Sequence, residues 1–299
     1  MNISIELPEY PDAREIRLED RDGLAALLLQ SQPQISEYTF TNLYAWRKSK
    51  RVLLSKVDDA PIILRELDGR MHLMPALTAL SISGVIGKLS MLGGPPPVYG
   101  LLKTEAELLK EYGYTVQPDR ENWDYVYLTR DLIELSGAKF RAKRQNINRC
   151  LSEHRCEYVP IDGPVIGECT AFLDRWCRMR HCEEDFELEA EIAAIKETLI
   201  HYLDLPVFGA AIRVDGSVEA FAIGERLNND TAVVHFEKAN SEIRGLYQVV
   251  NNWFCSNRLR EFTWVNREQD LGIPGLQRAK MEYNPHHFIE KYIATPPPG

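Results

Sequence analysis

The stretch "KANSEIRGLYQ", residues 238–248, joins a hydrophobic run typical of a strand to an amphipathic run typical of a helix. The first amides of a helix have no carbonyl partners, and the helix dipole adds positive potential there, so a helix start can bind an anion. Gly245 lets a ligand approach the backbone, and Arg244 can pair with a phosphate. The amides of Gly245, Leu246 and Tyr247 are therefore a candidate phosphate site. The alternative is an ordinary connection between a strand and a helix.

The elements around this joint follow a regular order over residues 156–294. Three strands precede it, "PVFGAAIRV", "SVEAFAIGERL" and "TAVVHFEKA", with hairpin signals between them. A strand "CEYVPI" and two helices come earlier, "VIGECTAFLDRWCRMRH" and "LEAEIAAIKETLIHYLD". After the joint come a helix "LYQVVNNWFCSN", a strand "EFTWVN", a helix "PGLQRAKMEY" and a last strand "HHFIEKYIA". The predicted order is β-α-α-β-β-β-α-β-α-β.

The first half of the chain repeats the beginning of this order in a weaker form. A strand and a helix lead into the aromatic segment "ISEYTFTNLYAW", residues 35–46, and then into three short strands, "RVLLSKV", "PIILREL" and "RMHLMPAL". Its glycines and prolines predict a rigid loop for "MLGGPPPVYG", residues 91–100. A helix "TEAELLKEYG" and a strand "WDYVYLT" follow. The two halves therefore read as two copies of one unit.

This order of elements resembles the GNAT (acyl-CoA N-acyltransferase) fold. The resemblance implies an α/β (α+β) chain of two tandem GNAT-like domains, each a mixed sheet flanked by helices. We expect a degenerate N-terminal domain over residues 1–134 and a catalytic C-terminal domain over residues 135–299. In GNAT enzymes the strand before the third helix splays from its neighbour, and the following loop binds the pyrophosphate of acyl-CoA.

Three further stretches carry a more specific resemblance. Residues 261–285, "EFTWVNREQDLGIPGLQRAKMEYNP", together with "HFEKANSEIRGLYQ" and "FRAKRQNINR", resemble the catalytic C-terminal domain of phosphatidylglycerol lysyltransferases. Those proteins are akin to the Fem-type transferases and use aminoacyl-tRNA. The GNAT loop pattern Arg/Gln-x-x-Gly-x-Gly/Ala is incomplete here, because Tyr247 replaces the second glycine. Acyl-CoA and aminoacyl-tRNA both remain open as donors.

The helix that begins near Lys139 carries basic side chains beside its apolar stripe. At 3.6 residues per turn, Lys143 and Arg144 flank that stripe, whereas Arg149 points away. They are candidates for binding the phosphates of CoA or of a tRNA acceptor end. The alternative is that their long stems cover apolar surface at a seam between the domains.

The candidate catalytic residues are Glu237, Glu268 and Lys280. An acceptor amine must lose a proton, which a carboxylate can take, and Lys280 points inward from its helix, where Glu268 or Asp270 can pair with it. By strand alternation we expect His235 on the same face as Glu237. We rank His235 below the glutamates. The full set of candidate pocket residues is His235, Asn266, Asp270 and Tyr283.

Composition limits the class of protein. The formal net charge of −9 argues against general coating of nucleic acids, although a local basic patch can still bind RNA. Six scattered cysteines predict free thiols, and their spacing favours buried thiols over a metal site. With no apolar run long enough for a membrane helix and no signal peptide, we expect a cytoplasmic protein. We expect no tightly bound cofactor, with acyl-CoA or aminoacyl-tRNA as co-substrate.

Two classes of function follow. The first is an enzyme that transfers an acyl or aminoacyl group to an amine or hydroxyl acceptor, such as a small molecule, a peptide or a lipid head group. The second is a catalytically silent GNAT-like module that binds a nucleotide or acyl ligand. Inward polar residues such as Lys280 and Glu268 favour the enzyme.

Overall fold

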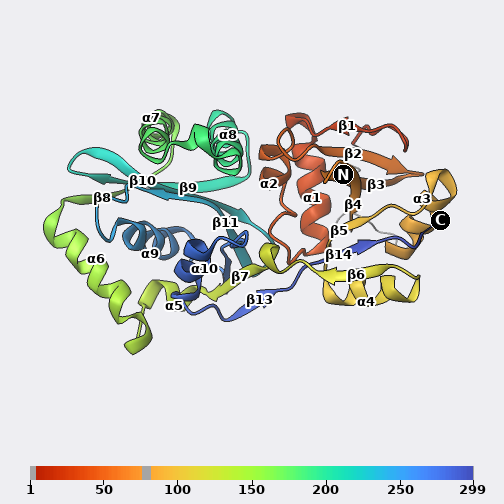
Figure 1. The fold of residues 1–299 in the computed structure, drawn as a ribbon. Helices are drawn as coiled ribbons and strands as arrows, with labels where there is room; N and C mark the ends of the chain where they lie inside the picture. Colours follow the sequence, from red (N-terminus) through yellow and green to blue (C-terminus); the bar gives the residue numbers. More distant parts are fainter. Residues whose placement is uncertain (1–4, 76–81, 299) are drawn as a thin grey trace. The chain divides into compact units, whose positions relative to one another are not determined.

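The computed structural model describes residues 5–75 and 82–298, which divide into two compact units (Figure 1). The first unit comprises the chain up to Asp124, the segment Gln269–Pro274 and the residues from Phe288 onward. The second unit comprises Tyr125–Glu268 and Gly275–His287. These interleaved units differ from the contiguous division at residues 134 and 135 that the sequence predicted.

The first unit is built on a mixed sheet. Within the described residues, the strand order is β1-β2-β3-β4-β5-β14-β6, in which β4 and β5 run parallel. Asp68 and Gly69, both at positive φ, form the two-residue turn between β3 and β4 that the sequence predicted. The elements of this unit are β1 (Arg14–Glu15), α1 (Arg21–Ser31), α2 (Phe40–Ala45), β2 (Val52–Val57), β3 (Ala60–Leu67), β4 (Arg70–Met74), α3 (Ile82–Gly93), β5 (Val98–Leu101), α4 (Lys103–Glu111), β6 (Thr115–Pro118) and β14 (Tyr292–Thr295).

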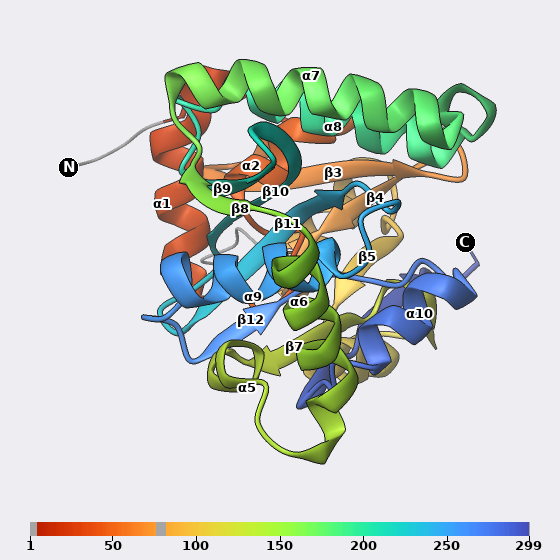
Figure 2. The same cartoon turned by 90° about the vertical axis from the view of Figure 1, so that its left-hand side faces the viewer.

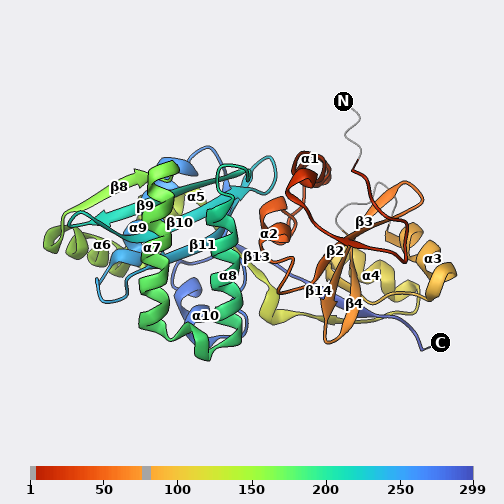
Figure 3. The ribbon, with the colours of Figure 1, turned by 90° about the horizontal axis from the view of Figure 1, so that it is seen from above.

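The second unit has a sheet of the same design. Among the described strands the order is β13-β7-β12-β11-β10-β9-β8, in which β11 and β12 run parallel. The elements are β7 (Asp124–Leu128), α5 (Thr129–Glu134), α6 (Arg141–Glu153), β8 (Cys156–Pro160), α7 (Gly163–Arg180), α8 (Phe186–Ile200), β9 (Val207–Val214), β10 (Ser217–Arg226), β11 (Thr231–Ala239), α9 (Leu246–Arg258), β12 (Trp264–Asn266), α10 (Pro274–Met281) and β13 (His287–Ile289). Figures 2 and 3 show α7 and α8 on one face of this sheet and α9 on the other.

The two sheets exchange their last strands. From β1 to β6 and again from β8 to β13 the chain follows the order β-α-α-β-β-β-α-β-α-β, which confirms the predicted repeat. The next strand of the first repeat, β7, lies in the second sheet between β12 and β13. The strand at the end of the second repeat, β14, takes the corresponding place in the first sheet, between β5 and β6. This exchange explains why each compact unit contains segments that are distant in the sequence.

Two features of β11 shape the second unit. The parallel ladder with β12 covers only three pairs and ends at Val233 and Asn266, although β11 continues to Ala239. Beyond Val233, β11 has no main-chain pairing on the side of β12, which itself ends at Asn266, and we call this opening the splay of β11 and β12. In the ladder with β10, Ile223 pairs with Phe236 and Gly224 pairs with Val234, so one residue of β11, His235, is left over as a β-bulge. Bulges turn side chains in new directions.

Two local expectations need correction. Residues 91–100 do not form one loop, because α3 ends at Gly93 and β5 begins at Val98. Residues 286–294 do not form one strand, because Glu290 and Lys291 separate β13 from β14, which lie in different sheets. The six cysteines are free thiols, as predicted. In the part of the chain that is described, no helix has the length and apolarity needed to cross a bilayer.

Candidate functional site

The candidate site lies where β11 and β12 diverge in the second unit. His235 and Glu237 come from β11, Asn266 ends β12, and Glu268 follows it within two residues. All four belong to the same compact unit. The structure therefore brings residues that the sequence singled out separately to the same part of the second sheet.

His235 lies between two carboxylates. Its Nδ1 is 2.9 Å from Oε1 of Glu268, its Nε2 is 3.1 Å from Oε2 of Glu225, and its side chain is only 1% exposed. Burial alone would lower the pKa of His235, but the hydrogen bonds to Glu225 and Glu268 and their negative charges outweigh it and raise the pKa to about 9. The imidazole is therefore a cation at neutral pH that donates from both nitrogens.

Glu237 contacts two donors that the sequence reading missed. Arg267 donates from Nη2 to Oε1 of Glu237, and Asn251 of α9 donates from Nδ2 to Oε2, both over 3.0 Å. The guanidinium carbon of Arg267 lies 4.7 Å from the ring centroid of Tyr283 and 5.6 Å from that of Tyr127. Burial opposes the charge on Arg267, but the negative charge of Glu237 outweighs it and raises the pKa of Arg267.

His235 and Glu237 point to opposite faces of the sheet, so the expectation that they share a face is wrong. Glu237 reaches α9 through Asn251. His235 reaches Glu225, which by alternation shares a face with Phe221, and the Phe221 ring packs edge-on against Phe172 of α7. The bulge at His235 breaks the alternation that the prediction assumed.

Side-chain ion pairs continue the contact between the strands where the backbone ladder stops. Beyond the last backbone pair, His235 bonds Glu268 and Glu237 bonds Arg267, so that one pair spans the splay on each face of the sheet. The segment after β12 is thus tied to β11 by charged side chains rather than by main-chain hydrogen bonds.

Lys280 supports the same segment from α10. Its Nζ donates to the carbonyl oxygen of Arg267, where the sequence suggested a carboxylate partner, and only 8% of the residue is exposed. The hydroxyl of Tyr127 donates to the carbonyl of Lys280 over 2.9 Å. Lys280 therefore helps to fix the backbone that carries Arg267 and Glu268.

Asn266 stabilises the turn that leads to Glu268, whereas Asp270 lies in the first unit. The Oδ1 of buried Asn266 accepts the Glu268 amide over 2.8 Å, and Glu268 has φ +55°, a left-handed conformation that is uncommon outside glycine. Asp270 lies in the first unit, where it pairs with Arg120 at 3.1 Å and accepts the amide of Gly272. It is not part of the second-unit cluster.

The two cations of the basic helix, α6, have partners within the protein. Lys143 is buried and donates to Oε2 of Glu282 over 2.7 Å, with its Nζ 4.4 Å from the ring centroid of Tyr283. Arg144 donates to the carbonyls of Leu135 and Gly137. These contacts support a structural role for both residues and leave their contact with phosphates a hypothesis.

Gly245, at the start of α9, allows this helix to pack closely against α6. It has φ +91°, and a Cβ added there would fall on the carbonyl oxygen of Asn146 in α6. The amide of buried Leu246 already donates to the carbonyl of Ile243 over 3.2 Å, whereas Arg244 is exposed. Burial raises the pKa of Tyr247, a residue that the sequence placed at the anion site. The close approach that requires a glycine is therefore to the α6 backbone.

The residues that the sequence reading missed carried weak signals. Asn251 is a polar residue on the apolar stripe that Leu246, Val250 and Phe254 form on α9, which marks it as a buried side chain in need of a partner. Arg267 adjoins Glu268 at the end of a short strand, but no local pattern pairs it with Glu237.

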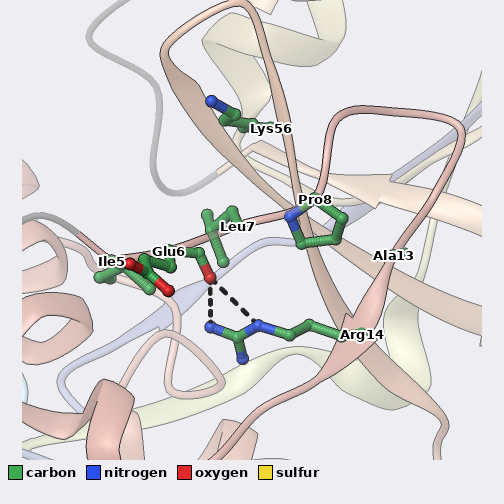
Figure 4. A pocket seen from close by; sticks show the side chains of 7 residues that line it. All are labelled: Ile5, Glu6, Leu7, Pro8, Ala13, Arg14 and Lys56. Atoms are coloured by element: carbon green, nitrogen blue, oxygen red, sulfur yellow. Dashed lines mark hydrogen bonds between the residues drawn. The ribbon is translucent and has the colours of Figure 1, made fainter.

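A depression elsewhere, in the first unit, does not resemble a catalytic site. Figure 4 shows it beside the N-terminal segment, lined by Ile5, Glu6, Leu7, Pro8, Ala13, Arg14 and Lys56. The guanidinium of Arg14 donates to the carbonyl of Glu6 and pairs with Asp20 at 2.7 Å. The positive charge of Arg14 in this depression is thus already balanced by Asp20.

Comparison with known proteins places most of the chain in one family. The family model described as "Phosphatidylglycerol lysyltransferase, C-terminal" matches residues 29–295. An uncharacterized protein of Mycoplasmoides gallisepticum is 22% identical over 188 residues, which are 57% of this chain and 55% of that protein. The chain thus spans little more than half the length of this curated relative.

Solved structures confirm the fold. A conserved protein of unknown function from Bacteroides thetaiotaomicron has a TM-score of 0.88 at 30% identity, over 97% of this chain and 99% of the other. The L-PGS structure from Bacillus licheniformis has a TM-score of 0.63 at 14% identity, over 98% and 94%. FemX has a TM-score of 0.59 at 9% identity, over 95% and 96%. The architecture is therefore that of tandem GNAT-like proteins.

Proposed function

The chain belongs to the family of phosphatidylglycerol lysyltransferase C-terminal domains, and we propose from this that it transfers an aminoacyl group from aminoacyl-tRNA to an amine or hydroxyl acceptor. The observation that carries the proposal is the splay of β11 and β12. Their ladder stops at Val233 and Asn266, and charged side chains from both strands gather beyond it. Such a grouping at a strand divergence is a suitable place for acyl transfer.

The proposed reaction is a direct transfer. The acceptor nitrogen or oxygen attacks the ester carbonyl of the donor, and its new bond to carbon forms as the bond to the ribose oxygen breaks. A base takes the acceptor proton and passes a proton to the departing ribose oxygen, which leaves as a hydroxyl. Glu268, whose side chain is 17% exposed, is our candidate base, and cationic His235 holds it in place. Glu237 then binds substrate, and Lys280 positions the segment after β12.

The proposal also specifies the donor. The glycine loop that would hold the pyrophosphate of CoA is incomplete, and Gly245 packs against α6. This observation favours aminoacyl-tRNA over acyl-CoA as the donor.

One observation favours a second candidate, a catalytically silent binding module. His235 and both oxygens of Glu237 are already satisfied by protein partners, as they would be in a site retained for structure. A silent module would bind a charged ligand without turnover.

The test combines transfer with binding. Total tRNA charged with a radiolabelled amino-acid mixture is incubated with the protein and phosphatidylglycerol vesicles, spermidine or a lysine-containing peptide, and label leaving the tRNA is followed to product by chromatography. We expect transfer to one acceptor class, and Glu268→Gln should lower its rate about 100-fold or more. Glu157→Gln, at an exposed position of β8, is the matched control and should leave the rate unchanged.

Three other outcomes would contradict the proposal. Binding of charged tRNA without transfer to any acceptor would support the silent module. Transfer from acetyl-CoA in place of aminoacyl-tRNA would assign the other donor. A full rate in folded Glu268→Gln would remove this carboxylate from the reaction.

A further inference from the structure

Two buried polar atoms beside Glu237 have no hydrogen-bond partner among the described residues. They are Oδ1 of Asn251, an acceptor, and Nη1 of Arg267, a donor. Asn251 is 1% exposed, so solvent does not satisfy its oxygen. Proteins rarely leave such atoms unpaired, because each costs about 1 to 3 kcal/mol when buried.

The arrangement of the two atoms is specific. Asn251 and Arg267 hold the two oxygens of Glu237 at 3.0 Å each, so the unpaired acceptor and the unpaired donor flank one carboxylate. The amide of Asn251 cannot be turned over to satisfy its oxygen, because that oxygen would then face Oε2 of Glu237. The two unmet groups match a ligand that donates at one end, accepts at the other and tolerates a negative charge between them.

We propose that Asn251, Arg267 and Glu237 form the subsite for the aminoacyl unit of the donor and select it over a plain acyl group. An aminoacyl ester carries a carbonyl oxygen and, one carbon away, an α-ammonium group. In this assignment the ester carbonyl lies in the opening between β11 and β12, so that Arg267 reaches it from the α9 face and the acceptor held by Glu268 reaches it from the opposite face. Nη1 of Arg267 donates to the carbonyl oxygen, Oδ1 of Asn251 accepts from the ammonium, and Glu237 supplies the complementary charge. This assignment rests on the proposed function and deepens it by naming the residues that read the α-amino group.

A plain acyl group fits this subsite less well for a physical reason. The acetyl group of acetyl-CoA has a carbonyl oxygen but no amine, so Oδ1 of Asn251 would stay buried and unpaired. Sites built to hydrogen-bond a substrate group reject analogues that lack it more strongly than apolar pockets reject size variants. Asn251 is thus the specificity-determining residue in this assignment.

The donor enters at the partly exposed edge of the cluster. The side chains of Glu237 and Arg267 are 12% and 13% exposed, whereas Asn251 lies deeper.

The test compares two forms of one donor. Total tRNA is charged with amino acids, half of it is N-acetylated with acetic anhydride, and filter binding gives the dissociation constant of each form and of uncharged tRNA. We expect the parent protein to prefer the free-amine form about tenfold or more, since one charge-assisted hydrogen bond is of that order. Asn251→Leu, similar in volume, should remove the preference while keeping the binding of the acetylated form. Asn257→Leu, at an exposed position of the same helix, is the matched control and should keep the preference.

The possible outcomes distinguish a failure of the subsite assignment from a failure of the proposed function. If charged tRNA binds no better than uncharged tRNA, the proposed function fails and this assignment fails with it. If the parent protein binds both charged forms equally, the function stands and the subsite is overturned, even if Asn251→Leu does not fold. A preference that survives in folded Asn251→Leu shows that Asn251 does not select the free amine, and also overturns the assignment.

Discussion

At the scale of single residues, His235 shows how partners decide the charge of a buried group. Its folded-state pKa of about 9 lies above the usual 6.5, so the folded protein binds this proton more tightly than the unfolded chain does. The resulting stabilisation is complete below about pH 6.5 and is lost as the pH rises through about 9. A difference of this size corresponds to on the order of 3 kcal/mol.

His235→Gln should remove this pH-dependent part of the stability. We expect the variant to be less stable than the parent protein by on the order of 3 kcal/mol at pH 6, and the gap to narrow as the pH approaches 9.5. Urea unfolding of both proteins across this range measures the gap, and titrating groups that do not interact with His235 cancel in the difference. A gap that stays constant with pH would mean that His235 is not protonated in the folded protein.

The residues of the candidate site were predictable in part. Glu237, Glu268 and Lys280 stand out because charged side chains on inward faces need a reason, and the structure places all three at the splay. Their partners were not predictable, because the pairing of Glu237 with Arg267 depends on how two distant strands diverge. The prediction that His235 and Glu237 share a face failed because of the bulge at His235. One extra residue in a strand reverses the face to which all the following side chains of that strand point.

At the scale of elements, the contact between α6 and α9 depends on Gly245. The helices approach so closely that a side chain at this position would collide with the backbone of Asn146, and φ +91° disfavours any other residue. A substitution there acts on packing first, so a loss of ligand binding in such a variant does not by itself show a ligand contact. This reasoning separates a structural glycine from a phosphate-binding glycine.

Gly245→Ala should destabilise the second unit by roughly 2 to 5 kcal/mol, from backbone strain and overpacking together. Gly216→Ala is the matched control, because Gly216 has φ +95° but open space around its Cβ position, so only the strain remains. Urea unfolding of the two variants measures the difference. Equal costs for the two substitutions would show that α6 yields easily and that packing does not require this glycine.

Elements with strong local patterns were predicted well, and those without were not. The hairpins of the second unit and the helix α9 follow from alternation, turn residues and apolar spacing. The helix α3 was missed because "SISGVIGKLSMLGG" contains glycines that lower helix propensity, and burial against the first sheet overrides that preference. The last segment was read as one strand because both halves are apolar, although each half pairs in a different sheet.

At the scale of the whole molecule, the exchanged strands have no local signal in the sequence. β7 looks like any strand of the first repeat, and only its non-local partners place it in the second sheet. A buried ion cluster in the first unit lies where the chain leaves for β7 and returns to β14. Lys291, wholly buried, bonds Glu37 at 2.5 Å and Asp124 at 2.7 Å. Burial alone would raise the pKa of Glu37, but the charge of Lys291 outweighs it and lowers that pKa to about 2.

Lys291→Met should therefore destabilise the first unit strongly, because it leaves two carboxylates buried without their cation. We expect a loss of about 3 to 5 kcal/mol, shrinking at acidic pH as protonation removes the repulsion between Glu37 and Asp124. Hydrogen exchange should rise first in β14, which follows Lys291 directly.

Lys196→Met is the matched control, since Lys196 is 45% exposed and its pair with Asp174 should be worth less than about 1 kcal/mol. Urea unfolding with exchange mass spectrometry measures both variants. If β14 stays protected and Lys291→Met costs no more than Lys196→Met, backbone pairing in the first sheet holds the exchanged strand without help from this cluster.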